Sequence, residues 1–243
     1  MWVLRARYWL GADPQALAGL YGYGPRPPVA AGVVAVLARA PVAGQAKTRL
    51  AASIGRSAAA RAQRRFTIDT VHNALAAGLG RVSLWCAPDA AHRFFRALHR
   101  RTGIDLQAQV EGDLGRRMAA VAERHFESTP GLPLLMVGTD CPVLSPGHLQ
   151  QAARMLSQHE AVLIPALDGG YVLLGLRRMV PEVFEDIAWS TPHVLAQTRV
   201  RLRAAGATWC EMEPLWDVDG LDDWQRYVEL RRARPRAQVE PAG

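Results

Sequence analysis

Short apolar segments suited to β-strands alternate along this 243-residue chain with longer segments suited to α-helices. The first of them are strands predicted near 33–38, 81–87, 104–110 and 133–138, and helices predicted near 57–77, 89–101 and 114–127. A crossover of helix length brings consecutive strands into parallel pairing and places the helices on the faces of the sheet. The alternation therefore predicts an α/β fold around a parallel sheet.

The rhythm changes in the second half of the chain. After a helix near 147–158, the apolar runs near 161–166 and 171–175 are separated by too few residues for a parallel crossover. One of these two strands is therefore expected to be antiparallel. The remaining predicted elements are a helix near 192–205, a strand near 208–212 and a helix near 221–232. Ser57, Asp89 and Thr191 are predicted as helix N-caps, because their side chains can accept hydrogen bonds from first-turn amides.

Residues 1–28 differ in composition from the rest of the chain, with a Gly- and Pro-rich break over 22–28. They are interpreted as an N-terminal extension, or as the result of a start codon assigned too early. A single domain is predicted over 29–232 and a flexible tail over 233–243.

The composition excludes several classes of protein. The formal net charge is +7 and the pI is near 10, but the basic residues are scattered and form no aromatic-interleaved stripe, so nucleic acid is not an expected partner. The three cysteines lie far apart and predict neither a disulfide framework nor a zinc site. The longest apolar run is about half the length of a membrane span, and no secretory signal is evident, so a cytoplasmic location is expected.

Lysine occurs once, at Lys47, although lysine and arginine together number 29. Lys47 lies in a Gly-containing loop between the first predicted strand and a helix, a common arrangement for holding phosphate. A compact ammonium suits a phosphate that moves during a reaction better than a planar guanidinium does. The alternative is that Lys47 is a solvated loop residue.

Several aspartates follow predicted strands, where ligands of open α/β sheets bind. Asp140 follows the strand near 133–138, although it could simply cap a turn before Pro142. The Asp168–Tyr171 segment is either a tight hairpin or a surface against which a ligand lies. Asp217 and Asp219 point the same way if the segment is extended, which suits a hard cation, but acids also favour a helix N-terminus.

Two further segments are candidates for substrate contact. Glu111–Met118 stands at a strand-to-helix turn, where its amides and arginines could meet a base, ribose or phosphate, or its acids could merely begin the helix. Another predicted helix is preceded by Trp189, Ser190 and Thr191. The hydroxyls of Ser190 and Thr191 either cap this helix or contact an acceptor substrate. Together, a basic loop and isolated aspartates indicate chemistry on a nucleotide pyrophosphate held through Mg²⁺ or Mn²⁺.

The ordered motifs resemble those of a known family. They are LARAPVAGQAKTRL over 37–50, GDLGRRM over 112–118, GTDCP over 138–142, DGGY over 168–171, WST over 189–191 and DVD over 217–219. The chain resembles, over about 32–230, the bacterial GT-A-type glycosyltransferase-like family, also labelled arsenosugar-biosynthesis glycosyltransferases. That family is similar to the 2-phospholactate guanylyltransferases and the nucleotide-diphospho-sugar transferase superfamily.

The resemblance implies a Rossmann-like, mostly parallel sheet of about seven strands with one antiparallel strand. It also implies that Lys47 and Arg49 lie over phosphates and that Asp140 binds the metal. Val143 stands where the family often has an acid, which argues against a second ligand from that loop, and the basic Arg39 leaves the preference for a base open.

The predicted site has four groups of residues. The catalytic candidates are Lys47 and Asp140, and the metal candidates are Asp140, Asp168 and Asp219. The nucleotide and phosphate candidates are Ala38, Arg39, Gly44, Lys47, Arg49, Gly112, Asp113, Arg116 and Thr139. The substrate candidates are Asp168, Gly169, Gly170, Tyr171, Trp189, Ser190 and Thr191.

Three functions are consistent with such a site. The first is metal-dependent glycosyl transfer from a nucleotide-sugar, which is favoured because the paired-glycine loop common in related nucleotidyltransferases is missing. The second is transfer of a nucleotide from a nucleoside triphosphate to a phosphorylated acceptor. The third, of another class, is a catalytically silent nucleotide-binding module. Both enzymatic functions predict a nucleotide and a small-molecule acceptor as partners.

Overall fold

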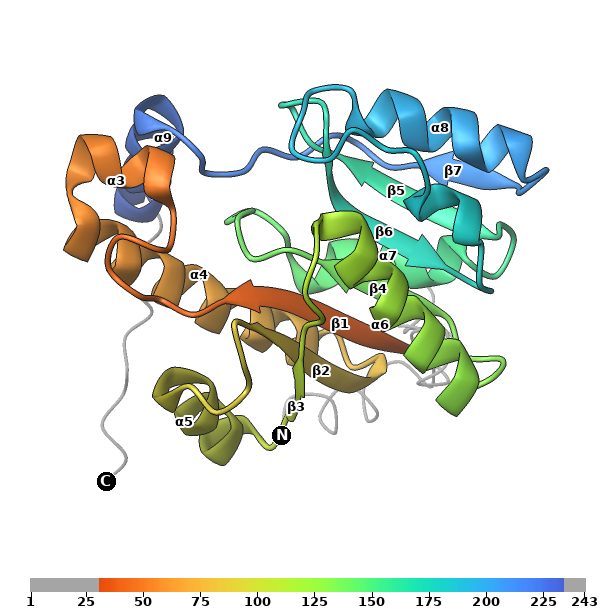
Figure 1. The fold of residues 1–243 in the computed structure, drawn as a ribbon, viewed down its shortest axis with the longest axis horizontal. Helices are drawn as coiled ribbons and strands as arrows, with labels where there is room; N and C mark the ends of the chain where they lie inside the picture. Colours follow the sequence, from red (N-terminus) through yellow and green to blue (C-terminus); the bar gives the residue numbers. More distant parts are fainter. Residues whose placement is uncertain (1–30, 234–243) are drawn as a thin grey trace, which may run out of the picture.

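The computed structural model describes residues 31–233 (Figure 1). Its strands are β1 (Gly32–Arg39), β2 (Gly80–Ala87), β3 (Asp105–Ala108), β4 (Leu134–Val137), β5 (Ala161–Pro165), β6 (Tyr171–Leu176) and β7 (Trp209–Glu211). Its helices are α3 (Thr48–Ile54), α4 (Arg56–Ala76), α5 (Arg93–Thr102), α6 (Leu114–Ser128), α7 (Pro146–Met155), α8 (Val194–Ala204) and α9 (Leu221–Ala233), with a short 3-10 helix, η1 (Pro181–Phe184).

The seven strands form one mixed sheet in the order β3-β2-β1-β4-β6-β5-β7. The pairs β1–β2, β1–β4, β2–β3 and β5–β7 are parallel. Strand β6 is antiparallel to both β4 and β5, because the short turn after β5 cannot make a parallel crossover. The predicted fold, with about seven strands and one of them reversed, is confirmed.

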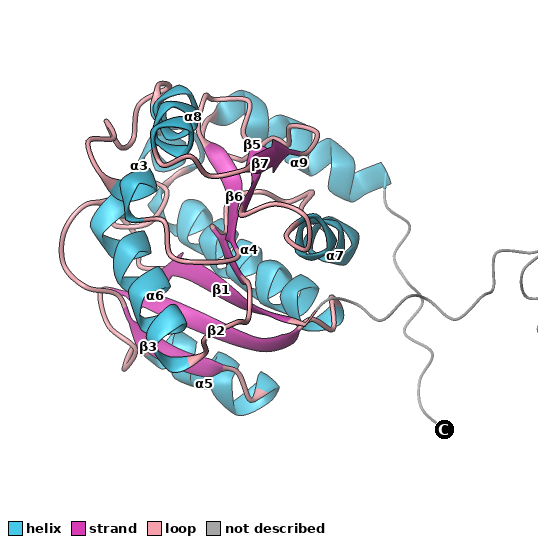
Figure 2. Ribbon diagram, turned by 90° about the vertical axis from the view of Figure 1, so that its right-hand side faces the viewer, coloured by secondary structure: helices cyan, strands magenta, loops and turns pink. Residues whose placement is uncertain are grey.

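Helices cover both faces of the sheet, as the buried central strands require. One core packs α4, α5 and α7 against the sheet, and the other packs α6, α8 and η1 against its opposite face. Figure 2 shows α8 and α7 on opposite sides of β6. Strands β4 and β5 are buried at every position, which explains why their sequences are continuous apolar runs.

A third, smaller apolar cluster joins α3, α4 and α9 beyond the end of the sheet (Figure 1). Leu50 of α3, Phe66 of α4 and Tyr227 of α9 are buried there, together with Trp216 and Val218 of the segment before α9. The rings of Phe66 and Tyr227 meet edge to face, with their centroids 4.9 Å apart. This cluster fixes the loop after β1 against a segment about 170 residues further along the chain.

The three predicted N-cap residues are wrong, although the helix predicted near 57–77 is found at Arg56–Ala76. Helix α4 begins after Gly55, so Ser57 lies inside it, and the short helix α3 was not predicted. Helix α5 is capped by His92, whereas Asp89 accepts from the Ala91 amide in the turn before it. Helix α8 begins at Val194, and Thr191 accepts from the His193 amide instead of capping the helix.

The single domain over 29–232 stays a prediction, and residues 29 and 30 lie outside the described residues. The predicted extension over 1–28 and the predicted tail, apart from Ala233 at the end of α9, lie outside the described residues. Within residues 31–233, no helix is both long and apolar enough to cross a membrane.

Candidate functional site

The topology brings the predicted motifs to one edge of the sheet. Strands β1, β3, β4, β5 and β7 run in the same direction, so the segments that follow them all leave the sheet at its carboxyl edge. The chain moves outward from β1 through β2 to β3 and then returns to β4 on the other side of β1. Such a reversal of strand order is where open α/β sheets bind ligands. Lys47 follows β1 and Asp140 follows β4, so the two residues flank the reversal.

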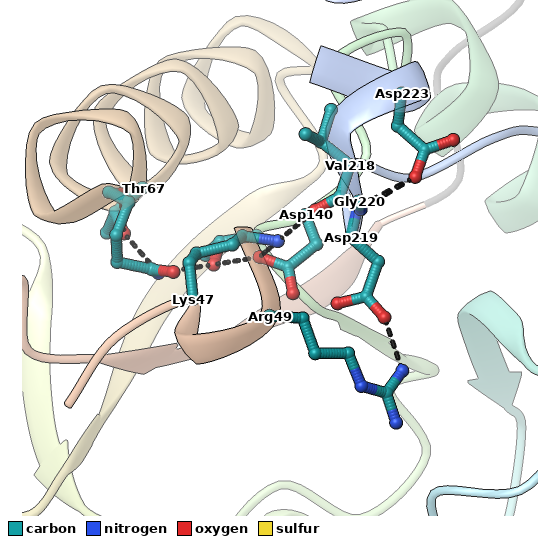
Figure 3. Close-up of polar contacts among 10 residues, drawn as sticks. Lys47, Arg49, Thr67, Asp140, Val218, Asp219, Gly220 and Asp223 are labelled. Atoms are coloured by element: carbon teal, nitrogen blue, oxygen red, sulfur yellow. Dashed lines mark hydrogen bonds and ion pairs between the residues drawn. The ribbon is translucent and has the colours of Figure 1, made fainter. Parts of the chain in front are cut away.

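Lys47 is buried at this edge, so it is not a solvated loop residue. Its side chain is 3% exposed, and its ammonium lies 2.9 Å from Asp140 Oδ1 and donates to the Val218 carbonyl at 2.5 Å (Figure 3). The ammonium also lies 5.7 Å from the centroid of the Phe66 ring. The lysine backbone is left-handed (φ 52°), an unusual conformation for a residue with a side chain. The three donors of the ammonium thus face three groups of the protein.

Asp140 is held from both sides while part of it stays open. Thr139 is buried, accepts from Gln63 Nε2 at 2.9 Å, and donates to Asp140 Oδ1 at 3.4 Å. The Val218 amide donates to the Asp140 carbonyl at 2.9 Å. The side chain of Asp140 is nevertheless 48% exposed, and no hydrogen bond to its Oδ2 occurs within residues 31–233. The carboxylate is therefore fixed in position with one oxygen available.

The two acids of the 217–219 segment have different neighbours. Asp219 accepts from the exposed Arg49 guanidinium at 2.6 Å, and its amide donates to Asp223 (Figure 3). Burial, followed by the nearby charges of Asp168 and Asp140, raises the pKa of the Asp217 carboxyl from 3.8 to about 6. Asp217 stands beside Asp219 in the Asp-Val-Asp motif, but only Asp219 is among the predicted metal candidates.

The loop before α6 supplies a second polar region at this edge. Asp113 caps α6 by accepting from the Arg116 amide at 2.8 Å, and the Arg116 side chain lies over Gly112. Arg117 was not predicted, yet its Nε is the one side-chain polar atom in the described chain that is buried without a hydrogen-bond partner. An orphan donor of this kind is costly unless a ligand or water satisfies it.

The remaining nucleotide candidates are dispersed. Ala38 is buried and its carbonyl accepts from Gln109, whereas Arg39 is exposed at the end of β1. Gly44 has a left-handed backbone (φ 84°) in the loop before Lys47.

The substrate candidates fall into two segments that contact each other. We define the Asp168 turn as residues 166–170 and the Trp189 loop as residues 185–193. Within the turn, the Gly170 amide donates to Asp168 Oδ1 at 2.9 Å, and the Leu195 amide, just past the loop, donates to the Gly169 carbonyl. Ser190 is exposed with a left-handed backbone, and Thr191 donates to the Ala188 carbonyl.

Tyr171 is partly buried and packs against the core on the α6 face of the sheet. Its hydroxyl contacts Met118 Sδ at 3.8 Å, and burial raises the pKa of the phenol. The thiols of Cys141 and Cys86 are unsuited to nucleophilic chemistry, since burial raises the pKa of Cys141 to about 11 and that of Cys86 to about 12.

The acids at this edge form an incomplete set of metal ligands. No group of three or more His, Cys, Asp or Glu side chains in residues 31–233 is arranged to hold a metal ion. Asp140 has an available oxygen, and Asp168 and Asp217 have no ion-pair partner in the same part of the chain. Crowded carboxylates with one open oxygen fit a hard cation whose other ligands come from phosphate and water.

The fold is that of the nucleotide-diphospho-sugar transferases. A protein from Desulfovibrio desulfuricans G20, provisionally assigned as a nucleotide-diphospho-sugar transferase, is 26% identical, with a TM-score of 0.75 and coverage of 86% of this chain and 90% of that one. The sequence matches the family described as "Uncharacterized protein conserved in bacteria (DUF2064)" over residues 70–191, half of the chain, and the chain belongs to this family. Both findings agree with the resemblance carried by the motifs.

More distant structures share the fold. One is a CMP:2-keto-3-deoxy-manno-octonic acid synthetase complexed with CTP, 12% identical with a TM-score of 0.54 over 84% of this chain and 99% of that one. Another is Rv0371c from Mycobacterium tuberculosis H37Rv in complex with manganese, 16% identical with a TM-score of 0.51 over 82% and 98%. At these identities the likeness shows the fold alone. A comparison with curated proteins finds no match.

Proposed function

We propose that this protein is a metal-dependent transferase that acts on an activated nucleotide at the carboxyl edge of its sheet. The observation that carries the proposal is the fixed Lys47–Asp140 pair beside the reversal of strand order. Close to this pair, burial and then the charge of Asp168 raise the pKa of the Asp217 carboxyl. Perturbed acids gathered at a sheet edge are typical of functional sites. The related protein from Desulfovibrio desulfuricans G20 supports the same class.

The donor is proposed to be a nucleotide-sugar. Asp140, with Asp168, Asp217 or Asp219, would hold Mg²⁺ or Mn²⁺, which when bound neutralises charge on the diphosphate. Arg49, whose side chain is 74% exposed, and the exposed Arg116 would contact diphosphate oxygens. Lys47 is buried, so its proposed role is to hold the Asp140 carboxylate in position and to balance its charge.

In the reaction, an acceptor oxygen would bond to the anomeric carbon while the bond from that carbon to the diphosphate breaks. The nucleoside diphosphate leaves and the acceptor loses its proton. Nucleotidyl transfer is the runner-up, because it uses the same residues with pyrophosphate as the leaving group.

The test is thermal denaturation of the full chain with nucleoside diphosphates, triphosphates and nucleotide-sugars, each with and without Mn²⁺ or Mg²⁺. A ligand that binds the native state raises Tm, and the shift grows with the logarithm of the ratio of ligand concentration to Kd once that ratio is large. The largest metal-dependent shift is expected with a nucleotide-sugar, whereas a preference for a triphosphate with pyrophosphate release would favour nucleotidyl transfer. Equal shifts without metal, unchanged in Asp140→Ala, would instead identify a silent nucleotide-binding module. No shift with any nucleotide would refute both enzymatic functions.

A further inference from the structure

The first turn of α6 carries a glycine where a side chain would collide with Trp189. A Cβ atom at Gly115 would lie 2.1 Å from the indole Nε1 and 2.4 Å from Cε2. Gly115 lies within a regular helix, so glycine is required here by space and not by backbone conformation. The indole of Trp189 therefore lies directly against the backbone of α6.

The same loop is fitted just as closely to the Asp168 turn. Gly169 has a left-handed backbone (φ 90°), and a Cβ there would lie 2.2 Å from the Pro192 carbonyl oxygen. The Leu195 amide donates to the Gly169 carbonyl at 2.9 Å. The Trp189 loop thus contacts α6 through its tryptophan and the Asp168 turn through its proline.

The Trp189 loop is held in an uncommon conformation. Asp186 (φ 49°) and Ser190 (φ 63°) are both left-handed, which persists only where surrounding contacts impose it. Ala188 supplies two of these contacts, because its amide donates to Gln197 Oε1 and its carbonyl accepts from the Thr191 hydroxyl, each at 2.7 Å. A loop held in this way can transmit a displacement from one end to the other.

Tyr171 provides a second set of contacts between α6, Trp189 and the Asp168 turn. The rings of Tyr171 and Trp189 meet edge to face, with centroids 6.5 Å apart, and the Tyr171 hydroxyl contacts Met118 in the second turn of α6. Tyr171 directly follows the Asp168 turn. The Trp189 loop therefore contacts the C-terminal part of this turn through Pro192 at Gly169 and through Trp189 at Tyr171, the next residue.

We infer that Trp189 is a positioning residue that couples the first turn of α6 to the Asp168 turn. Asp113 and Arg116 on one side and Asp168 on the other are then set in one arrangement by a single side chain. That these residues share one site rests on the proposed function, whereas the coupling itself rests on the packing alone.

The test uses amide hydrogen exchange of the full chain in Gly115→Ala, Trp189→Ala and the double variant. Gly147→Ala is the matched control, because Gly147 occupies the same second position of α7 and a Cβ there meets only Ser145 Oγ at 3.6 Å. In Gly115→Ala, the amides of the Asp168 turn and of Leu195 are expected to exchange about tenfold faster, as local opening becomes easier. Gly147→Ala should leave them unchanged.

The double variant separates the contact from a general effect on α6. With the indole removed there is room for a Cβ, so Gly115→Ala should add no further exchange to Trp189→Ala. Should Gly115→Ala alone fail to fold, the exchange of the double variant is compared with that of Trp189→Ala. Equal exchange in these two proteins supports the contact, and faster exchange in the double variant contradicts it. Unchanged exchange in the Asp168 turn, or an equal effect of Gly147→Ala, would overturn the coupling.

Nucleotide-dependent Tm shifts are also measured on variants of Trp189. A purely structural role of Trp189 would leave these shifts unchanged. Trp189→Ala should weaken the metal-dependent shift more than Trp189→Phe, and equal retention of that shift in both variants would contradict a positioning role. Absence of any shift in the wild-type chain would refute the proposed function, while the exchange data would still decide the coupling.

Discussion

The acids at the two edges of the sheet are treated differently. At the amino edge, two acids are paired with arginines: Asp105 accepts from Arg81 at 2.8 Å, and Glu160 accepts from Arg178 at 2.6 Å. At the carboxyl edge, Asp168 and Asp217 have no ion-pair partner within residues 31–233, and their negative charges repel each other.

The pKa directions follow this difference. The hydrogen bond from Arg178, with one from the Thr208 amide, lowers the pKa of Glu160, whereas burial and like charge raise that of Asp217. A paired acid stabilises the fold that holds it, while a crowded acid is a cost that a bound cation can relieve. This difference supports the proposal that the carboxyl edge binds a ligand, whereas the ion pairs at the amino edge contribute to stability.

The largest effect is expected from removing the acid at the centre of the carboxyl edge. Asp140→Asn should lose the metal-dependent part of nucleotide stabilisation and lower any transferase activity by about a thousandfold, as loss of a principal electrostatic group does. Thermal denaturation with and without Mn²⁺ measures the first effect. Asp105→Asn at the amino edge should keep the full shift, and a comparable loss in both variants would remove the distinction between the edges.

Next comes the buried cation that holds Asp140. Lys47→Met leaves the Val218 carbonyl and Asp140 without their shared donor, so unfolding free energy should fall by about 1–3 kcal/mol. Lys47→Arg keeps the charge but brings a planar fork into a side-chain site that is 3% exposed, and should also be destabilised.

The control for Lys47 is Arg49→Ala, which removes an exposed ion pair and should cost less than about 1 kcal/mol. Urea denaturation compares the variants. Similar small losses for Lys47→Met and Arg49→Ala would contradict a positioning role for the lysine.

A smaller effect with a diagnostic sign is expected from Asp217→Asn. Because the folded pKa is raised from 3.8 to about 6, the favourable contribution of the protonated carboxyl is fully present below pH 3.8 and is lost as pH rises through 6. The asparagine variant should therefore be more stable than the wild type at pH 7 to 8, with the difference vanishing near pH 4. Tm measured across this range tests it; a variant that is less stable at pH 8 would show that Asp217 is not crowded.

The smallest effect is expected at the amino edge and has the opposite sign. The folded pKa of Glu160 is lowered, so its contribution is present above the unfolded value of 4.5 and is lost as pH falls through the folded pKa. Glu160→Gln should slightly lower Tm at pH 7, and this effect should shrink as pH falls below 4.5. The same sign of change for Glu160→Gln and Asp217→Asn at pH 7 would break the comparison.

The sequence was sufficient for the order of elements because each carries its own local pattern. The helix starts were misplaced where Asp89 and Thr191 form turns just ahead of α5 and α8. The short α3 was missed because its stability comes from Leu50 packing in the third apolar cluster and not from local propensity.

Part of the site was predictable because Lys47 and Asp140 each follow a strand that has a local sequence pattern. Because ligands of open α/β sheets bind at the carboxyl ends of strands, Lys47 and Asp140 could be predicted to lie at one edge of the sheet. The contact of Lys47 with Val218, and the different surroundings of Asp217 and Asp219, depend on packing between segments about 170 residues apart. The contact of Gly115 with Trp189 likewise has no local signal, since Gly115 is an ordinary helical residue apart from the space it leaves.

The central claim is that the carboxyl edge is a metal site that a nucleotide diphosphate completes. Calorimetric titration of Mn²⁺ into the full chain, with and without saturating nucleoside diphosphate, tests it most directly. Mn²⁺ should bind about tenfold or more tightly with the nucleotide present, and the nucleotide should gain the same factor from Mn²⁺. Equal Mn²⁺ affinity with and without nucleotide, or unchanged coupling in Asp140→Asn, would contradict the account.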